Sequence, residues 1–392
     1  MAWFQIQNAH VVAPEDLGVT DVLCWNDRIV AVGKDIGPPS GAGVERVDAS
    51  GRTLLPGLID PHIHIMGASG GDGPMYRTTD LPVSRIARAG VTTVVSPIGT
   101  DSLSRTVPAL LMRAVAATAE GIHAYAYIGG WRKPAPALTG DVQTDVMYLD
   151  RVLGIKVAVA DPCAPPFSVD ELAHLAQAAV VGGRLVGKRT VLHVHIGDRP
   201  EGLRDVWDAG KQSGLPLDRF VVTHVNRQPD LLRQAIDFAK AGGSIDITCQ
   251  VRKDQGYANA VDPGDAVEEA LAAGAPAERV TLSSDSGAAY PRPDGSGMYM
   301  AGPDGILRTL RQVVDRGMSW TQAAGLGSRY AADLLGLAGK GRIAEGADAD
   351  LLLLTEDGTV DRVWSGGRLM VADGEAVVRG YFEAVESRES RV

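Results

Sequence analysis

The sequence predicts an α/β protein in which eight parallel strands and their connecting helices form a (β/α)₈ barrel, or TIM barrel. Three observations predict this fold. Eight short apolar runs lie between residues 58 and 284, stretches of helical periodicity separate them, and short alternating segments with turn residues occur at both ends. We therefore expect residues 55–340 to form the barrel, and residues 1–54 and 341–392 to form one small β-sandwich domain.

The barrel strands are predicted from apolar runs rich in β-branched residues. They are expected at 58–65, 91–97, 124–129, 154–160, 190–196, 220–225, 244–248 and 280–284. Helices are expected at 170–181, 229–241 and 264–273, with a longer helical region at 306–337 after the last strand. The strands expected for the β-sandwich include 21–25, 28–32, 350–354, 360–365 and 368–371.

Composition excludes several classes of function. The 48 acidic residues outnumber the 38 basic ones, and a net negative chain repels nucleic acid and anionic membrane surfaces. Three widely spaced cysteines argue against a disulfide framework and favour a reducing compartment. The first residues show no secretory signal pattern, and no apolar run approaches the ~18 residues that span a bilayer. We expect a cytoplasmic protein with no nucleic-acid partner and no membrane association.

Two histidines, His62 and His64, are spaced two apart in the first predicted strand. Residues two apart on a strand face the same side. We therefore expect both imidazoles to reach one metal ion at the C-terminal face of the barrel, where active sites of this architecture lie. The alternative is a pair of buried histidines with satisfied hydrogen bonds, and the spacing alone gives the two interpretations similar weight.

Similar residues on other predicted strands favour the metal site. Lys156 lies within an apolar strand, where an unpaired ammonium carries a large desolvation cost. Either Lys156 pairs with a carboxylate such as Asp161, or it reacts with CO₂ to give a carbamate that bridges two cations, which is the interpretation we favour. His195 and His224 end strands five and six and suit a second metal ion. His193 shares a strand face with His195, and spacing does not choose between them.

The last predicted strand leads to Asp285. An aspartate at this place can bind a metal ion and accept the proton of a metal-bound water, which makes Asp285 the candidate catalytic base. The histidines outside this series, which are His10, His123, His174 and also His193, are interpreted as structural or solvent-exposed.

These motifs resemble the amidohydrolase superfamily and, within it, the isoaspartyl (β-aspartyl) dipeptidases. The likeness runs nearly end to end and rests on Leu55-Pro56-Gly57-Leu58-Ile59-Asp60, Gly99-Thr100-Asp101-Ser102, Gly154-Ile155-Lys156, Thr223-His224-Val225-Asn226-Arg227, Ser244-Ile245-Asp246-Ile247-Thr248 and the segment 280–285. The family pattern also selects His195 over His193, because the family histidine is followed by an apolar residue, Gly197 and Asp198.

The resemblance implies a site with two divalent metal ions, in this family zinc. His62, His64 and Asp285 would hold one ion, and His195 and His224 the other. A hydroxide and a CO₂-derived carbamate on the strand-four lysine would bridge the two ions. The resemblance also implies a small-molecule amide as the substrate, and it suggests a homo-oligomer.

The substrate-binding positions match the family only in part. Thr100 and Arg227 are kept. Trp131 replaces a tyrosine that polarises the scissile carbonyl, Cys163 replaces a carboxylate-binding arginine, and Ala289 replaces a serine. Because a bidentate carboxylate donor is lost at Cys163, a substrate with fewer charged ends becomes plausible.

The glycine-rich segment 67–73 follows the first predicted strand. Family dipeptidases carry a glutamate there that holds the substrate amino group. Here Gly71 occupies the matching position, and a shift of register would let the neighbouring Asp72 make this contact. A solvated turn is the alternative for Asp72.

The sequence therefore favours a metal-dependent hydrolase that cleaves a C–N amide bond by attack of a bridging hydroxide, with β-aspartyl dipeptides or related N-acyl amino acids as substrates. A hydrolase of cyclic amides, imides or lactones with the same metals is the alternative. An inactive metal-binding scaffold is disfavoured, because every expected ligand is present. A nucleotide-binding barrel is disfavoured, because no phosphate-binding loop of the expected form occurs.

Overall fold

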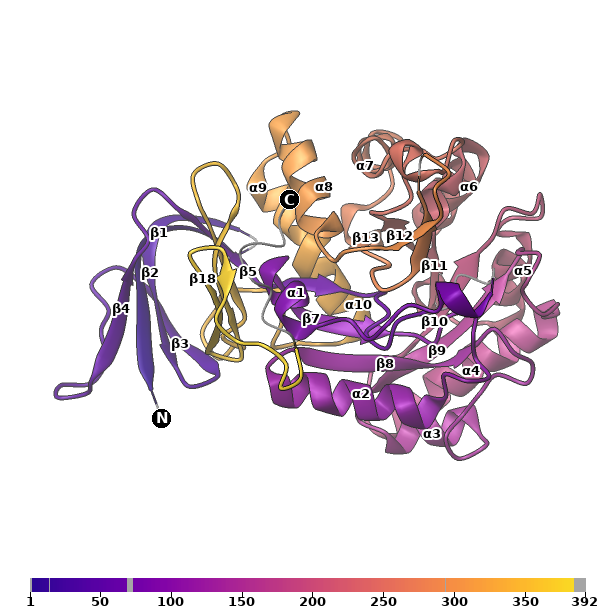
Figure 1. Ribbon diagram of the computed structural model, residues 1–392, viewed down its shortest axis with the longest axis horizontal. Helices are drawn as coiled ribbons and strands as arrows, with labels where there is room; N and C mark the ends of the chain where they lie inside the picture. The colour runs from indigo at the N-terminus through magenta and orange to yellow at the C-terminus, as the bar shows by residue number, and fades with distance from the viewer. Residues whose placement is uncertain (1, 14, 69–72, 293, 384–392) are drawn as a thin grey trace.

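The computed structural model describes residues 2–13, 15–68, 73–292 and 294–383. These residues form a barrel with a separate sheet beside it (Figure 1). Among them, no helix combines the length and the apolar character that crossing a membrane requires.

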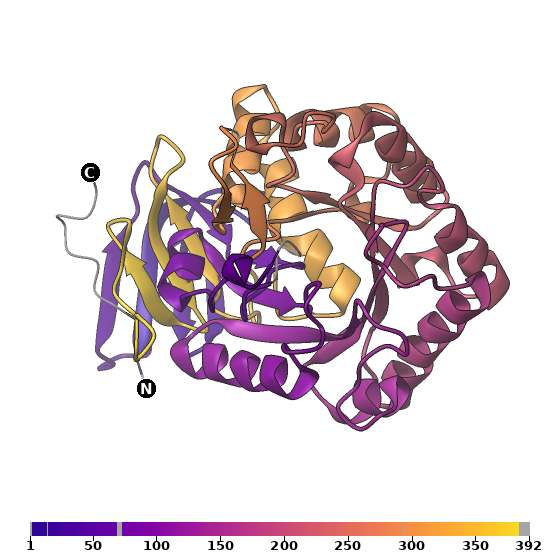
Figure 2. The same ribbon diagram turned by 45° about the vertical axis from the view of Figure 1, so that its right-hand side comes forward.

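The barrel sheet consists of eight parallel strands that neighbour one another in chain order. They are β6 (Leu58–Asp60), β7 (Val91–Ser96), β8 (His123–Gly130), β9 (Val152–Val159), β10 (Val191–Ile196), β11 (Phe220–Thr223), β12 (Ser244–Thr248) and β13 (Val280–Ser283). Just beyond the first and last strands, the amides of Asp285 and His64 donate to the carbonyls of His62 and Ser286 over 3.0 and 2.8 Å, which draws the two edges together. The strands curve around a common axis with helices outside them (Figure 2), which confirms the predicted barrel.

The helices of the barrel alternate with its strands. They are α1 (Val83–Arg88), α2 (Val107–Glu120), α3 (Val142–Tyr148), α4 (Val169–Leu185), α5 (Arg204–Ser213), α6 (Pro229–Lys240), α7 (Pro263–Ala272), α8 (Gly305–Asp315), α9 (Trp320–Ala324) and α10 (Tyr330–Leu335). The helical region expected at 306–337 is interrupted, because Gly317 takes a φ of 107° after α8 and Ser319 caps α9. A π-helical turn, Gly325–Arg329, then joins α9 to α10.

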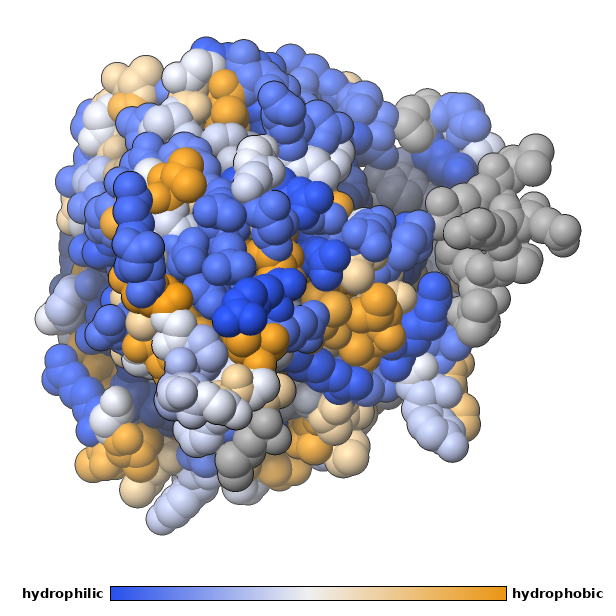
Figure 3. All heavy atoms as spheres, turned by 90° about the vertical axis from the view of Figure 1, so that its left-hand side faces the viewer, coloured by the Kyte–Doolittle hydropathy of each residue, from blue (hydrophilic) through white to orange (hydrophobic). Residues whose placement is uncertain are grey.

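Strands from both ends of the chain come together in one nine-stranded sheet, where the sequence predicts a small β-sandwich built from both ends. They are β1 (Trp3–Val12), β2 (Asp16–Trp25), β3 (Arg28–Gly33), β4 (Val44–Asp48), β5 (Thr53–Pro56), β16 (Leu351–Leu354), β17 (Val360–Ser365), β18 (Arg368–Ala372) and β19 (Glu375–Ala376). The antiparallel pairing of β5 with β16 joins the two halves. The C-terminal strands lie between the N-terminal strands and the barrel (Figure 1). The face that points away from the barrel is mainly hydrophilic with smaller hydrophobic patches (Figure 3).

The first barrel strand is shorter than predicted. β6 ends at Asp60, so His62 and His64 lie in the segment after the strand and not within it. Pro61 has no N–H to continue the ladder, and the Asp60 carboxylate accepts hydrogen bonds from the amides of His62 and Ser284, each over 3.2 Å. The alternation of strand faces therefore does not explain why the two imidazoles share one cavity. The two imidazoles share one cavity because the barrel closes there, with the segment after β6 hydrogen-bonded to the segment after β13.

A buried ionic cluster connects the barrel to the sheet. Lys340 contacts the carboxylates of Asp350 at 2.6 Å and Asp348 at 2.9 Å, and His123 of β8 lies 3.2 Å from Asp350. Lys340 and Asp350 are each about 4% exposed or less. Burial alone would raise the pKa of Asp350, but the charge of Lys340 and the contact with His123 hold this pKa well below its usual range.

Candidate metal centre and active site

A cavity of about 230 Å³ lies at the C-terminal ends of the barrel strands. Five elements supply the residues predicted as metal ligands: the segment after β6, strands β9 and β10, and the segments after β11 and β13. The cavity brings together all six of them, namely His62, His64, Lys156, His195, His224 and Asp285.

Asp285 faces two of the predicted imidazoles. Its Oδ1 atom lies 3.2 Å from His64 Nε2 and 3.6 Å from His62 Nε2. Possible ligand atoms of His62, His224 and Asp285 all lie within 4.8 Å of one another. Burial alone would raise the pKa of Asp285, but the hydrogen bond to His64 and the charge of His224 outweigh burial and lower this pKa to about 2. The carboxylate is therefore ionised and can serve as a ligand.

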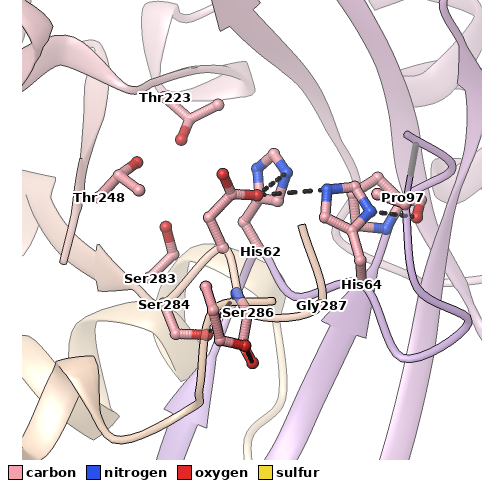
Figure 4. A network of polar contacts seen from close by, with 12 residues as sticks. His62, His64, Pro97, Thr223, Thr248, Ser283, Ser284, Ser286 and Gly287 are labelled. Carbon is pink, nitrogen blue, oxygen red and sulfur yellow. Dashed lines mark hydrogen bonds and ion pairs between the residues drawn. The ribbon is translucent and has the colours of Figure 1, made fainter. Parts of the chain in front are cut away.

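For two of the histidines, a contact at the ring nitrogen Nδ1 fixes the orientation of the ring. His64 Nδ1 lies 3.2 Å from the carbonyl oxygen of Pro97 (Figure 4), and His224 Nδ1 lies 2.7 Å from Thr248 Oγ1. Because a carbonyl only accepts hydrogen bonds, His64 must carry its proton on Nδ1, which leaves Nε2 free to bind a metal ion. Imidazole nitrogens with a carboxylate are a donor set that suits zinc, so the residues fit the metal that the sequence predicts.

His195 lies on the other side of the cavity. Its ring packs edge-on against His224, with centroids 4.5 Å apart, and against Trp131 at 4.6 Å. Its Nε2 atom lies 3.3 Å from Asp161 Oδ2. Asp161 was predicted only as a possible partner of Lys156, yet it belongs to the cavity wall beside His195.

Lys156 is buried in the middle of β9 and points into the cavity. Its exposed fraction is 1%, and its Nζ atom lies 5.1 Å from the ring centroid of Trp131. Among the described residues no ion pair forms with Lys156, so the alternative of a Lys156–Asp161 pair is not found. Burial lowers the pKa of Lys156 to about 8, although Asp285 and Asp161 act in the opposite direction.

The described substrate-contact candidates also line the cavity: Thr100, Trp131, Cys163, Arg227 and Ala289. The Arg227 guanidinium is held by Asp161 at 3.8 Å and Asp198 at 3.7 Å. Cys163 is exposed. Asp72 and Gly71 lie outside the described residues.

Two tyrosines of the cavity were not predicted from the sequence. Tyr290 donates a hydrogen bond to Asp285 Oδ2 over 2.5 Å, and its ring contacts that of Tyr257, which lies 5.7 Å from the Arg227 guanidinium. Tyr257 lies in the segment after β12, and Tyr290 lies on the short strand β14 (Ala289–Pro291) that follows β13. Position in a segment that follows a barrel strand is the only sequence signal that marks them, because barrel active sites are built from these segments.

His193 lies behind the cavity wall. Its Nε2 atom is 2.9 Å from His62 Nδ1, and its ring stacks on Tyr127 with centroids 4.8 Å apart. Burial lowers the pKa of His193 to about 3, so the ring is neutral at neutral pH. The sequence interpretation of His193 as a structural residue omitted this contact with His62.

A model of the amidohydrolase family matches residues 53–370, and the chain belongs to this family. The crystal structure of a β-aspartyl dipeptidase from Fervidobacterium islandicum, in complex with the dipeptide β-Asp-Leu, is 31% identical with a TM-score of 0.87. The match covers 96% of this chain and 98% of that one. A dihydropyrimidinase from Brevibacillus agri is 19% identical with a TM-score of 0.69, over 96% of this chain and 97% of that one, and shares the fold.

Sequence similarity to curated relatives is more local. An imidazolonepropionase of Caulobacter vibrioides is 27% identical over 220 residues, which cover 52% of this chain and 54% of the relative. An adenine deaminase of Paracoccus denitrificans is 36% identical over 63 residues, which cover 16% of this chain and 10% of the relative. The chain thus spans about half of the first relative and a tenth of the second.

Proposed function

We propose that this chain is a binuclear metal-dependent amidohydrolase that cleaves β-aspartyl dipeptides or related N-acyl amino acids. The observation that carries the proposal is the convergence of four imidazoles, one buried lysine and the Asp285 carboxylate on a single cavity. The full-length likeness to a dipeptidase crystallised with β-Asp-Leu supports the substrate class. The homo-oligomeric state and the cytoplasmic location stay predictions.

In the proposal, the residues around the cavity form two sets. His62, His64 and Asp285 would hold one ion, and His195 and His224 the other. Lys156, as its carbamate, would lie between them. Two divalent ions, when bound, polarise the substrate carbonyl and make hydroxide available from water at neutral pH.

Asp285 has the geometry of the proton carrier. Its Oδ1 atom faces the imidazoles, while Oδ2 points to the Tyr290 hydroxyl. In the proposed reaction, Asp285 accepts the proton of the attacking water and passes it to the leaving nitrogen. Water adds to the carbonyl carbon and the C–N bond breaks, so that amide and water give a carboxylic acid and an amine.

Arg227 orients the substrate through a carboxylate group. Its side chain is only 14% exposed and is held by two acidic neighbours, which fixes the guanidinium at the cavity wall. Among the described lining residues it is the one guanidinium. A bidentate carboxylate contact at this place positions the scissile bond and makes no bond itself.

A second candidate function is the hydrolysis of cyclic amides, imides or lactones. The described cavity wall also carries Trp131, Cys163 and Ala289, which offer a substrate no further guanidinium. Such a wall suits a substrate with one charged end or none.

Hydrolysis of a substrate panel by zinc-loaded protein, with bicarbonate present, tests the proposal. The panel holds β-aspartyl dipeptides, N-acyl amino acids, cyclic imides and lactones, and Asp285→Asn serves as the inactive control. We expect the fastest turnover with β-aspartyl dipeptides or N-acyl amino acids. Turnover restricted to the cyclic compounds would replace the first candidate by the second.

A further inference from the structure

The barrel interior contains a histidine pair of which one member lies outside the cavity. His193, on β10, is fully buried, and His62 is 1% exposed. His193 Nε2 and His62 Nδ1 lie 2.9 Å apart, and the two rings meet edge-on with centroids 4.9 Å apart. The closeness and burial of these two atoms make the contact a hydrogen bond without competition from bulk water.

We propose that His193 is a positioning residue that fixes the ring orientation and the tautomer of His62, and thereby sets the affinity of the metal position formed by His62, His64 and Asp285. This inference rests on the metal site of the proposed function. It adds a residue that is not among those that line the cavity.

One ring nitrogen of His62 faces the site. His62 Nε2 is turned to Asp285 Oδ1, 3.6 Å away. A metal ion there needs the lone pair of Nε2, so the single proton of a neutral imidazole must lie on Nδ1. That N–H then donates to His193 Nε2, which must act as the acceptor.

Two other predicted histidine ligands have a different kind of partner at Nδ1. His64 Nδ1 faces the carbonyl of Pro97, and His224 Nδ1 faces the hydroxyl of Thr248. A carbonyl fixes the tautomer by itself, whereas an imidazole can donate or accept. The tautomer of His62 therefore depends on the tautomer of His193.

The remaining ring atom of His193 gives a specific consequence. When His193 Nε2 accepts, its proton lies on Nδ1, and this buried atom has no hydrogen-bond partner among the described residues. The ring is held instead by its stack on Tyr127, at an interplanar angle of 13°. His193 is thus oriented by packing and can turn only by breaking that stack.

Three variants separate the hydrogen bond from the packing. His193→Phe keeps a flat ring against Tyr127 but removes the acceptor. His193→Gln keeps an acceptor oxygen. His174→Phe, on the exposed face of α4 and outside the cavity, controls for the loss of an imidazole that could bind metal adventitiously. Circular dichroism and thermal unfolding establish that each variant folds.

Zinc affinity is measured by competition with a chromophoric chelator, in the absence of substrate. We expect His193→Phe to weaken the affinity for one of two ions by about 10- to 100-fold, as loss of the group behind a ligating histidine does. His193→Gln should recover most of this affinity, and His174→Phe should bind as the wild type does. With a substrate of the panel, His193→Phe should lower kcat at subsaturating zinc without raising KM.

Two results would overturn the inference. One is wild-type zinc affinity in a folded His193→Phe protein. The other is a His193→Gln variant that binds zinc no better than His193→Phe although both fold, because packing and not the acceptor would then matter. The expected affinities without hydrolysis of any panel substrate would support the inference and contradict the proposed function. A wild-type chain that binds no divalent ion would contradict both.

Discussion

The two carboxylate oxygens of Asp285 have different partners in the cavity. One of its oxygens faces His64 and His62, and the other accepts the hydrogen bond from Tyr290. A hydroxyl held against the second oxygen fixes the carboxylate rotamer, so that the first oxygen stays directed at the metal position. Tyr290 is therefore expected to support catalysis although it is not a ligand.

Replacing Tyr290 by phenylalanine tests this role. A hydrogen bond to a charged group contributes about 1.5 to 3 kcal/mol, which corresponds to a loss of about 10- to 100-fold in kcat/KM. Steady-state kinetics on the best panel substrate measure the loss. Tyr299→Phe is the matched control, since the hydroxyl of Tyr299 bonds to Gln255 and not to Asp285. Equal rates in both variants would remove Tyr290 from the catalytic machinery.

Arg227 gives a second prediction for a single residue. Lysine keeps the positive charge but loses the planar fork that binds a carboxylate through two hydrogen bonds. We expect Arg227→Lys to lower kcat/KM for β-aspartyl dipeptides by about 10- to 100-fold, and to change lactone hydrolysis far less. An equal loss on both substrate classes would show that Arg227 supports the cavity and does not read a carboxylate.

At the scale of elements, the strands were predicted well where apolar runs end in turn residues. β12 begins and ends where the sequence predicts, at Ser244 and Thr248, because Gly242-Gly243 marks its start. β6 was predicted too long, since regular strand pairing ends at Asp60, although the amide of Ile63 still donates to the carbonyl of Val95 over 3.2 Å. The hydrophobic pattern predicts a strand, but a proline within it interrupts the regular pairing.

The part of the site that could be predicted is the part that residue type and position along the strands determine. The six predicted ligands stand on strands or directly after them, so their convergence follows from the barrel. Tyr257, Tyr290 and the His193–His62 contact could not be predicted, because no local pattern fixes the conformation of the loops or the rotamers of buried rings.

The loop after β13 contains a glycine that the site requires. Gly287 has a φ of 83°, and a Cβ atom there would lie 2.2 Å from the carbonyl oxygen of His64. Gly287→Ala must therefore displace the His64 segment, and we expect it to lower both zinc affinity and stability, the latter by about 1 to 3 kcal/mol. Gly295→Ala is the control, with a φ of 72° and open space around the new Cβ. If both variants bind zinc equally well, close packing at Gly287 does not shape the site.

At the scale of the whole molecule, the buried Lys340–Asp350 pair lies where the sheet packs against the barrel. Removing one partner of a buried ion pair takes compensation away from the charge that stays, although Lys340 keeps its contact with Asp348 at 2.9 Å. We expect Asp350→Asn to lower the free energy of unfolding by about 3 kcal/mol at pH 7. The exposed pair of Arg316 and Asp265 is the comparison, where Asp265→Asn should cost less than about 1 kcal/mol.

The difference in the free energy of unfolding between the wild type and Asp350→Asn should become smaller as the pH falls. The pKa of Asp350 is lowered in the folded state, so its contribution to stability is complete above the unfolded-state pKa of about 3.9 and is lost as the pH falls toward the folded-state pKa. Urea unfolding of the wild type and of Asp350→Asn should therefore give free energies of unfolding that converge below about pH 4. A constant difference down to pH 3 would contradict the assignment.

The most direct test of the metal-dependent reaction is the release of leucine from β-Asp-Leu before and after metal removal. Wild-type protein loaded with zinc in bicarbonate buffer should hydrolyse the dipeptide, lose this activity on dialysis against a chelator, and regain it when zinc is returned. Activity that persists in protein shown to be metal-free would contradict the account.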